Sequence, residues 1–344
     1  MKKQASHGSK PRAAKRAQRR KFLSAAGAGL ATLAFPQILL PGRAFAQGGL
    51  KELPVGGLIG AACHNAGLET ARAKGIVEAQ GLRIAHKEYS AGANLIQAIA
   101  AGDVVAGVCG GNPTLLGAAQ GLDLKILANA NVEGSVLIVG PGVKSPKDLN
   151  GRKIGTPGIA AIQDTLLLLY EKQLGIKTDH VFVKVTDMPT MLRKEEIAGY
   201  IVWEATGTAG LAMSGGRILA TSKDIYRDHE CCVLVVSGKF LRDEPDAALR
   251  LVRSHALGLK YALAHHDELV QLIAKRDALA SQELARSALS HVRYKYPPVS
   301  DPAGMVFVVR ALLEAKKIER DRVPDVERFV ANVVDNRAVQ SLNL

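Results

Sequence analysis

The chain has 344 residues, of which 47% are hydrophobic, and its formal net charge is +13. A chain of this length exceeds the usual size of a single hydrophobic core, so we expect two domains. Ten of the 45 basic residues fall within residues 1–46, where there is no acid, so the rest of the chain has 35 bases against 32 acids. This near balance argues against a nucleic-acid partner, which would need a basic footprint.

The first 46 residues have the pattern of an export signal. A basic segment ends in the sequence RRKFL at 19–23, a small-residue apolar stretch covers 25–40, and an A-x-A cleavage pattern ends at Ala46. The paired arginines followed by Phe-Leu favour the twin-arginine route. The alternative is an uncleaved membrane anchor, but the apolar stretch is short for a span, and Pro36 and Pro41 break it. We therefore expect a periplasmic or cell-surface bacterial protein, cleaved after Ala46.

The chain up to residue 139 alternates predicted strands and helices. Apolar runs bounded by turn residues indicate strands, and helical spacing of apolar residues indicates the helices between them. The predicted order is a strand at 53–59, a helix at 68–79, a strand at 82–89, a helix from about 94, a strand at 104–109, a helix at 114–120, and strands at 124–128 and 135–139.

A second alternating series begins near residue 151. It starts with a strand and a glycine-bearing turn at 151–158, which lacks the Gly-Lys-Ser/Thr ending of a phosphate-binding P-loop. From Glu244 onward apolar residues recur at helical spacing, so the tail is predicted to be helical. The predicted elements of this series are helices at 162–173, from 187 and at 206–214, and strands at 181–185, before 204, at 218–220 and at 233–236.

Two segments in the two series share one construction. Residues 94–111 and residues 190–204 each combine an apolar helix, an acidic turn and a short apolar strand. The repetition predicts two similar lobes of mixed α/β structure, with lobe I formed by 47–138 and 237–344 and lobe II by 139–236. Loops at carboxyl strand ends are where open α/β sheets bind ligands, so a ligand cleft is expected between the lobes. Two connections would let the lobes close by a hinge.

The strand end at Trp203 and Glu204 gives the main candidates for ligand contact. Trp203 is the only Trp of the chain, and its ring offers a flat face and an N–H donor. The alternative is a core position between strand and helix. Glu204 would accept hydrogen bonds from an amine or protonated heterocycle, or would cap the following helix. A carboxylate in the cleft modestly favours a neutral or cationic nitrogen compound over a small anion.

Several turns add backbone N–H groups to the predicted cleft. A helix start that follows small residues favours a negative group, although an ordinary cap explains the same residues. This interpretation keeps a small oxyanion or sulfonate as an alternative ligand. The candidates from these turns are Asn65, Gly92, Asn94, Gly111, Asn112, Thr156 and Gly158.

Cysteine and histidine gather at two predicted cleft positions. Cys63 and His64 lie at the first turn, and His229, Cys231 and Cys232 precede the return strand. These side chains could line the ligand pocket, pack as small buried groups, or form a soft metal site, although their spacing matches no standard closed metal site. Four cysteines allow three full pairings, and the sequence does not choose among them. No cofactor is expected.

The mature chain as a whole resembles the solute-binding proteins of ABC transporters for nitrate, sulfonate and taurine, a family that also includes binders of thiamin precursors. Two of its longest matching segments are KSPKDLNGRKIG at 144–155 and the segment 191–204. The chain departs from the family pattern at Val105, Ala198 and Ala205. The resemblance implies a type II periplasmic-binding-protein fold with mixed sheets flanked by helices.

The same resemblance implies a function. A protein of this kind is a monomer that captures a small organic solute between its lobes and delivers it to an ABC permease in the inner membrane. We expect a binding protein rather than an enzyme, because the sequence has no Ser-His-Asp order, no H-E-x-x-H motif and no nucleophile elbow. A metal-binding protein that uses His229, Cys231 and Cys232 is the alternative.

Overall fold

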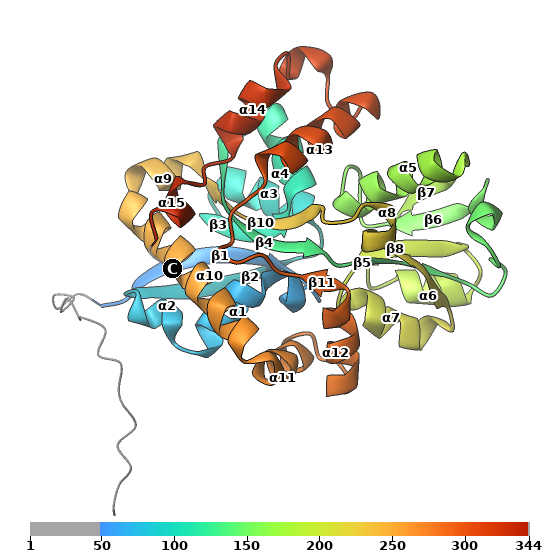
Figure 1. Cartoon of the computed structure of the whole chain (residues 1–344), viewed down its shortest axis with the longest axis horizontal. Coiled ribbons are helices and arrows are strands. Elements are labelled where there is room, and N and C mark those ends of the chain that lie inside the picture. Colours follow the sequence, from blue (N-terminus) through green and yellow to red (C-terminus); the bar gives the residue numbers. More distant parts are fainter. Residues whose placement is uncertain (1–48, 343–344) are drawn as a thin grey trace, which may run out of the picture. The chain divides into compact units, whose positions relative to one another are not determined.

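The computed structural model describes residues 49–342, which fold around two mixed β-sheets (Figure 1). The predicted export signal at 1–46 lies outside the described residues. Within 49–342, none of the helices combines the length and the apolar character needed to cross a membrane.

The first sheet has six strands, and both segments of the chain that flank the second sheet contribute to it. Its three strands β2, β1 and β3 are parallel, and β10, β4 and β11 continue the sheet in antiparallel pairs. In spatial order the strands are β11 (Val292–Arg293), β4 (Leu124–Glu133), β10 (Glu230–Ser237), β3 (Ala106–Gly110), β1 (Lys51–Leu58) and β2 (Leu82–Tyr89).

The second sheet has five strands and the same plan. Strands β7, β6 and β8 are parallel, and β5 pairs antiparallel with both β8 and β9. In spatial order the strands are β7 (Asp179–Phe182), β6 (Lys153–Thr156), β8 (Gly199–Trp203), β5 (Ser135–Val139) and β9 (Arg217–Thr221). Each sheet therefore has three parallel strands followed by a strand that entered from the other sheet. The predicted α/β fold of two similar lobes with mixed sheets is confirmed.

The chain passes between the sheets twice. It leaves the first sheet at Gly134, between β4 and β5, and it returns between β9 and β10. The predicted lobe boundaries near 138 and 236 stay a prediction, although strand pairing puts β5 in the second sheet and β10 in the first. The chain therefore changes sheets just before β5 on the way out and just before β10 on the way back, rather than after these strands.

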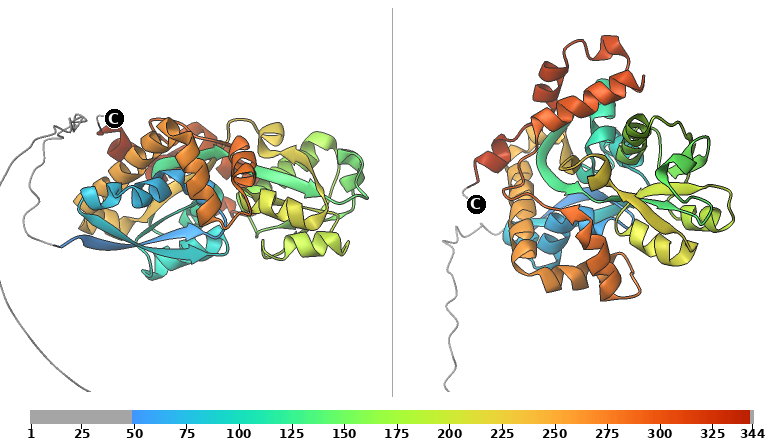
Figure 2. Two further views of the ribbon diagram at one scale, coloured as in Figure 1. Left: turned by 90° about the horizontal axis from the view of Figure 1, so that it is seen from below. Right: turned by 45° about the vertical axis from the view of Figure 1, so that its right-hand side comes forward.

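Helices cover both sheets, and the C-terminal ones return to the first sheet as predicted. In Figure 2 the second sheet with its helices, green to yellow, lies to one side of the C-terminal helices, orange to red. Helices α10 and α1 pack against each other, as do α13 and α4. The helices around the first sheet are α1 (Ala66–Ala73), α2 (Ile76–Ala79), α3 (Gly92–Ala101), α4 (Gly111–Ala119), α9 (Gly238–Asp243), α10 (Pro245–Ala264), α11 (His266–Arg276), α12 (Gln282–Ser290), α13 (Pro302–Glu314), α14 (Val326–Val333) and α15 (Arg337–Gln340), with 3-10 turns η1 (Ala62–Asn65) and η3 (Arg320–Arg322).

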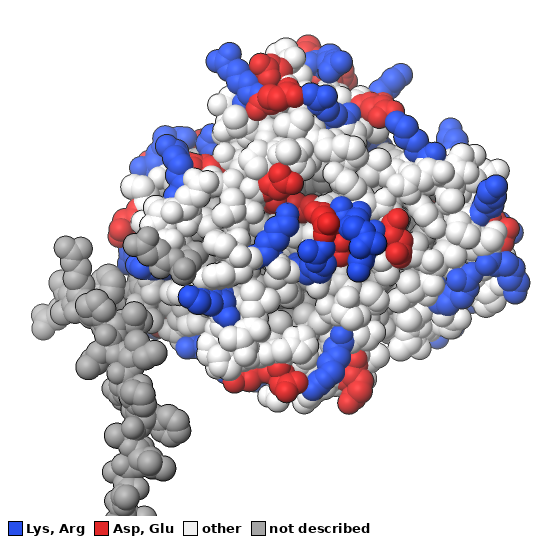
Figure 3. Space-filling view, viewed as in Figure 1, with Lys and Arg blue, Asp and Glu red and all other residues white. Residues whose placement is uncertain are grey.

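The second sheet carries fewer helices. They are α5 (Ile162–Leu174), α6 (Met188–Arg193), α7 (Thr206–Ser214) and α8 (Ser222–Ile225), with the 3-10 turn η2 (Pro146–Leu149). On the face of the molecule in Figure 3, basic and acidic side chains are interspersed rather than gathered by sign. This distribution agrees with the near balance of charge outside the first 46 residues.

One strand is much longer than its sequence predicts. Strand β4 continues past the apolar run 124–128 through Asn129, Asn131 and Glu133, all of which are buried. Their polar groups are largely satisfied inside the sheet: Asn131 Nδ2 donates to the carbonyl of Glu133 at 2.9 Å, and Asn131 Oδ1 accepts from the backbone N–H of Cys232 at 3.2 Å. Polar residues alternate with Ala130 and Val132 here, so the continuous apolar run that predicted the strand ends at Ala128 although the strand goes on.

Candidate functional site

A cavity of about 220 Å³ lies between the two sheets and takes its wall from both. Among the described residues, none of those lining it carries an Asp, Glu, Lys or Arg side chain. The wall is largely apolar with a few polar groups, which is the usual character of a site for a small organic molecule. Half of the predicted site residues line this cavity: His64, Gly92, Asn94, Gly158, Trp203, Cys231 and Cys232.

The other half lie behind the wall or in neighbouring packing. Cys63 is fully buried, and its carbonyl accepts a hydrogen bond from the Tyr294 hydroxyl at 2.6 Å. Asn65 and Thr156 are buried, and each keeps one side-chain oxygen without a hydrogen-bond partner among the described residues. Gly111 begins α4. These four are placed by the fold rather than turned toward the cavity.

Three further predicted residues form contacts of their own. Asn112 Nδ2 donates to the Thr165 hydroxyl at 2.8 Å, which joins α4 to α5. His229 Nδ1 bonds with the carbonyl of Tyr226 at 2.5 Å, and the two rings stack. The third is Glu204, which contacts Thr208 and His291.

Trp203 closes one side of the cavity at the end of β8. It is 4% exposed, and its ring lines the wall. The indole Nε1 donates to the carbonyl of Ile59 at 3.2 Å, across to the end of β1. Trp203 also packs in a hydrophobic cluster with Val136 and Tyr200, so it combines the two positions expected from the sequence, and its N–H donor already has a partner.

Glu204 directly follows Trp203 but points away from the cavity. Its side chain is fully buried, and Oε2 accepts a hydrogen bond from the backbone N–H of Thr208 at 2.8 Å. Oε1 contacts the Thr208 hydroxyl at 3.0 Å and His291 Nδ1 at 2.7 Å. Of the two roles expected from the sequence, the observed contacts are those of a carboxylate at the start of helix α7.

Three helices begin at the cavity wall. The residues before their first turns are Ala91 for α3, Gly110 for α4 and Ala161 for α5, and all three line the cavity. In the described part of the chain, no side chain caps any of these starts. Uncapped first-turn N–H groups carry partial positive charge, so this wall favours a hydrogen-bond acceptor or an anionic group, although the buried Asp164 in the first turn of α5 offsets part of that charge.

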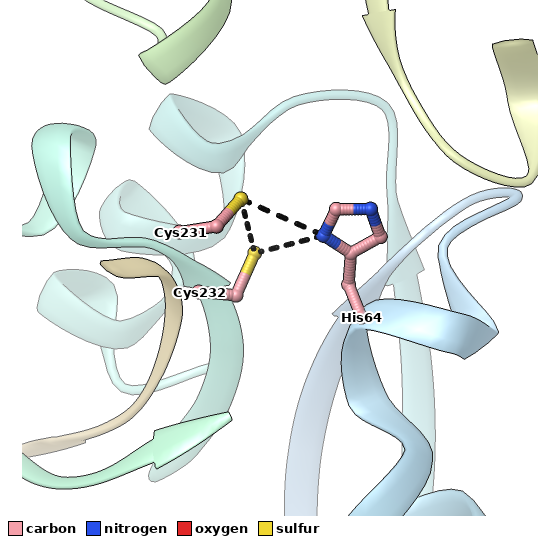
Figure 4. A group of neighbouring side chains, drawn as sticks. All are labelled: His64, Cys231 and Cys232. Atoms are coloured by element: carbon pink, nitrogen blue, oxygen red, sulfur yellow. Dashed lines mark hydrogen bonds between the residues drawn. The ribbon is translucent and has the colours of Figure 1, made fainter. Parts of the chain in front are cut away.

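His64, Cys231 and Cys232 form a compact cluster on another part of the wall (Figure 4). His64 Nδ1 is 3.6 Å from each of the two Sγ atoms, which are 3.8 Å apart. His64 Nε2 lies 3.0 Å from the carbonyl of Gly134. The three side chains are between 1% and 5% exposed.

The two thiols of this cluster differ in acidity because they share one site. A hydrogen bond from Cys232 holds the pKa of Cys231 well below its usual range and outweighs the effect of burial. The same pairing, together with burial, raises the pKa of Cys232 well above its usual range. Burial lowers the pKa of His64, but the negative charge of Cys231 overcomes that effect and raises it. Cys231 and His64 therefore stabilise each other's charged forms.

The sequence did not identify the small and apolar part of the wall. It also missed the polar Gln163, whose Nε2 donates to the Ser135 hydroxyl at 2.9 Å. The one available signal was adjacency to a predicted residue: Ala91 and Ala93 flank Gly92, and Pro157 and Ile159 flank Gly158. The residues not predicted are Leu58, Ala61, Ala91, Ala93, Gly110, Pro113, Pro157, Ile159, Ala161, Ile162 and Gln163.

Comparison with known proteins bears on both fold and family. A ligand-binding component of an ABC-type import system from Staphylococcus aureus, solved with zinc bound, superposes with a TM-score of 0.73 at 19% identity, over 85% of this chain and 98% of that one. The periplasmic nitrate-binding protein of Synechocystis PCC 6803 gives a TM-score of 0.72 at 14% identity, over 86% of this chain and 89% of that one. The fold is therefore that of periplasmic binding proteins.

Sequence comparison agrees with the resemblance given above. The taurine-binding periplasmic protein of Escherichia coli (strain K12) is 27% identical over 181 residues, which are 51% of this chain and 56% of that protein. The match thus spans little more than half the length of this curated relative. These relatives are binding proteins by name, in agreement with the expectation of a binding protein rather than an enzyme. The NMT1/THI5-like family matches residues 63–269, and the chain belongs to this family.

Proposed function

We propose that the chain is the solute-binding component of an ABC importer and captures a small organic solute in the cavity between its sheets. The observation that carries the proposal is the cavity itself, with walls from two similar α/β units, three uncapped helix starts and the ring of Trp203. The named functions of the relatives support it. The partner would be a permease in the inner membrane, and the working location would be the periplasm, reached through the twin-arginine signal predicted at 1–46.

The wall favours a solute with one planar or apolar part and one acceptor group. The planar part would lie on Trp203 and Ile159, and the acceptor would meet the N–H groups at the starts of α3, α4 and α5. An amine or protonated heterocycle would be favoured if a carboxylate lined the cleft. Because the oxygens of Glu204 contact Thr208 and His291, a sulfonate or carboxylate is now the better-supported acceptor. A neutral heterocycle with acceptor atoms is the second candidate.

The single Trp makes this proposal easy to test. Trp203 is the only Trp in the chain and lies in the cavity wall, so its fluorescence reports on the cavity alone. We expect saturable fluorescence changes on titration with taurine or an alkanesulfonate, and weaker or no change with alkylamines. Nitrate and pyrimidines complete the panel. Native mass spectrometry of protein purified without refolding identifies any solute that the cavity retained.

A variant tests whether the ring contacts the solute. Trp203→Ala should weaken binding about tenfold in calorimetry, because an aromatic contact of this kind is worth roughly 1 kcal/mol or more. Trp203→Phe keeps an aromatic face, loses the bond to Ile59, and should weaken binding less. The proposal fails if no solute of the panel binds, none is retained, and Trp203→Ala changes neither result.

A further inference from the structure

We propose that His64, Cys231 and Cys232 form a three-ligand site for a thiophilic divalent cation such as Zn²⁺, with the fourth position open to the cavity. The sequence suggested that His229 would join the cysteines. In the structure His64 Nδ1 lies 3.6 Å from both sulfur atoms, whereas His229 Nδ1 bonds with the carbonyl of Tyr226 and, of the two cysteines, the His229 side chain contacts Cys231 alone. Within residues 49–342, these three form a set whose ligand atoms lie within 4.8 Å of one another.

The spacing of the three ligand atoms is that of a tetrahedral zinc site. Zinc binds thiolate sulfur at about 2.3 Å and imidazole nitrogen at about 2.0–2.1 Å, so tetrahedral angles require an S–S separation of about 3.8 Å and S–N separations of about 3.5–3.6 Å. The observed separations are 3.8 Å between the sulfur atoms and 3.6 Å from His64 Nδ1 to each of them. The three atoms therefore already stand at three corners of the required tetrahedron.

Adjacent cysteines reach the same ion only because strand β10 is irregular. In a regular strand successive side chains point to opposite faces, which would separate the two sulfur atoms. The pairing of β10 with β4 shifts register on both sides of Cys232. Such an irregularity re-aims a side chain, and here it turns both sulfur atoms toward His64 (Figure 4). The N–H of Cys232 is held there by Asn131 Oδ1 at 3.2 Å.

The far side of His64 is also arranged as metal sites require. A histidine that binds a metal through one nitrogen usually donates its other ring N–H to a carbonyl or carboxylate, which fixes the ring and the tautomer. His64 Nε2 donates to the carbonyl of Gly134 at 3.0 Å and leaves Nδ1 for the ion. A Cβ at Gly134 would lie 2.7 Å from His64 Cε1, so the glycine makes room for the ring in this position.

Charge supplies an independent argument. Among the described residues, none of those lining the cavity carries a Lys or Arg side chain that would repel a cation. Two thiolates and a neutral imidazole would balance a divalent cation, and thiolate ligands select soft ions of the zinc class. Since all three residues line the cavity, the fourth coordination position would face it.

Metal binding can be measured without knowledge of the solute. The full chain, reduced and handled without oxygen, is titrated with Zn²⁺ in competition with a chromophoric chelator. We expect one Zn²⁺ per chain. Co²⁺ in its place should give the visible bands of a tetrahedral ion and a thiolate-to-cobalt charge-transfer band. These two readings use the unmodified chain and are independent of the transport function.

Variants then locate the ion. His64→Ala and the double change Cys231→Ser with Cys232→Ser should each lower Zn²⁺ affinity at least about 100-fold, because disturbing outer partners of a metal ligand alone costs 10–100-fold. The control is Cys109→Ser, which changes another fully buried thiol, in contact with the Thr114 hydroxyl 3.7 Å away. This variant should bind Zn²⁺ like the unmodified chain.

Three results would overturn the proposal. The first is the absence of stoichiometric Zn²⁺ uptake by the reduced chain. The second is a Co²⁺ complex without a thiolate charge-transfer band. The third is an equal loss of affinity in Cys109→Ser. If the double variant does not fold, the Co²⁺ spectrum of the unmodified chain still decides the question.

Discussion

At the scale of single residues, adjacent residues near the cavity contact different parts of the structure. Side chains alternate in direction along a strand and its extension. Trp203 ends β8 and faces the cavity, whereas Glu204 faces helix α7 and His291. The cavity wall therefore includes an aromatic side chain and, among the described residues, no carboxylate. A preference for cations cannot be inferred from the sequence Trp-Glu alone, because the direction of each side chain decides which of them a solute touches.

A cluster of His180 with Asp164 and Glu171, residues that do not line the cavity, should make stability depend on pH. His180 on β7 bonds through Nδ1 to Asp164 at 2.6 Å and through Nε2 to Glu171 at 3.2 Å. Burial lowers the pKa of His180, but these carboxylates outweigh it and raise the pKa to about 9. Lys317 Nζ also lies 4.0 Å from Asp164 Oδ2.

The sign of the effect follows from the raised pKa. A folded-state pKa above the unfolded value of about 6.5 gives stability that is complete below pH 6.5 and lost as pH rises through about 9. We expect His180→Gln to lower the free energy of unfolding by about 3 kcal/mol at pH 6 and by much less at pH 10, since one pKa unit equals about 1.4 kcal/mol. Urea unfolding at both pH values measures it. His266→Gln, at an exposed histidine, is the control, and an equal loss at both pH values would contradict this prediction.

At the scale of elements, the carboxylate of Glu204 should stabilise α7 rather than select a solute. Glu204→Ala leaves the N–H of Thr208 and the ring of His291 without their partner. We expect a loss of about 2–3 kcal/mol in urea unfolding, because buried groups that lose a charged hydrogen-bond partner incur a desolvation penalty of this size. Solute affinity, read from Trp203 fluorescence, should change less than twofold.

The control for this prediction is Glu52→Gln, at an exposed acid on β1. It should leave stability within about 0.5 kcal/mol of the original, as surface changes usually do. A Glu204→Ala protein of normal stability but much weaker solute binding would return Glu204 to the site.

Local pattern was enough to predict many of the elements, but not the full length of β4 or the directions of the side chains. Strands β2 and β5 and helix α7 have the predicted limits, because apolar runs and turn residues fix such elements locally. The positions of His64 and Gly92 in the cavity wall were also predictable, because both lie in turns that follow strands. The pairing of His64 with Cys231 and Cys232 was not, because it depends on a register shift between β10 and β4, strands about 100 residues apart.

At the scale of the whole described unit, the two sheets are joined at the cavity by a few specific bonds. The carbonyl of Gly60, just after β1, accepts from the N–H of Ala205 at 3.0 Å and from the Thr206 hydroxyl at 3.1 Å. Trp203 bonds to Ile59 beside them. These contacts hold the end of β1 against the start of α7. A hinge motion that opens the cavity would have to break them.

Gly60 offers a way to disturb this junction without touching the cavity wall. Its φ is +64°, and a Cβ there would lie 2.4 Å from the Thr206 hydroxyl. Gly60→Ala should therefore push the two sheets apart and weaken solute binding about tenfold. Gly75→Ala is the matched control, because Gly75 has φ +68° but nothing within 4 Å of its added Cβ. Both changes incur the same left-handed strain of about 1–2 kcal/mol.

Small-angle scattering and Trp203 fluorescence together test this prediction. The radius of gyration of the unliganded Gly60→Ala chain should exceed that of Gly75→Ala, and only the former should bind solute more weakly. Adding Thr206→Ala removes the hydroxyl that meets the new Cβ, so the double variant should recover most of the affinity. If Gly60→Ala and Gly75→Ala behave alike in both measurements, backbone strain explains the effect, and the junction between β1 and α7 does not control access to the cavity.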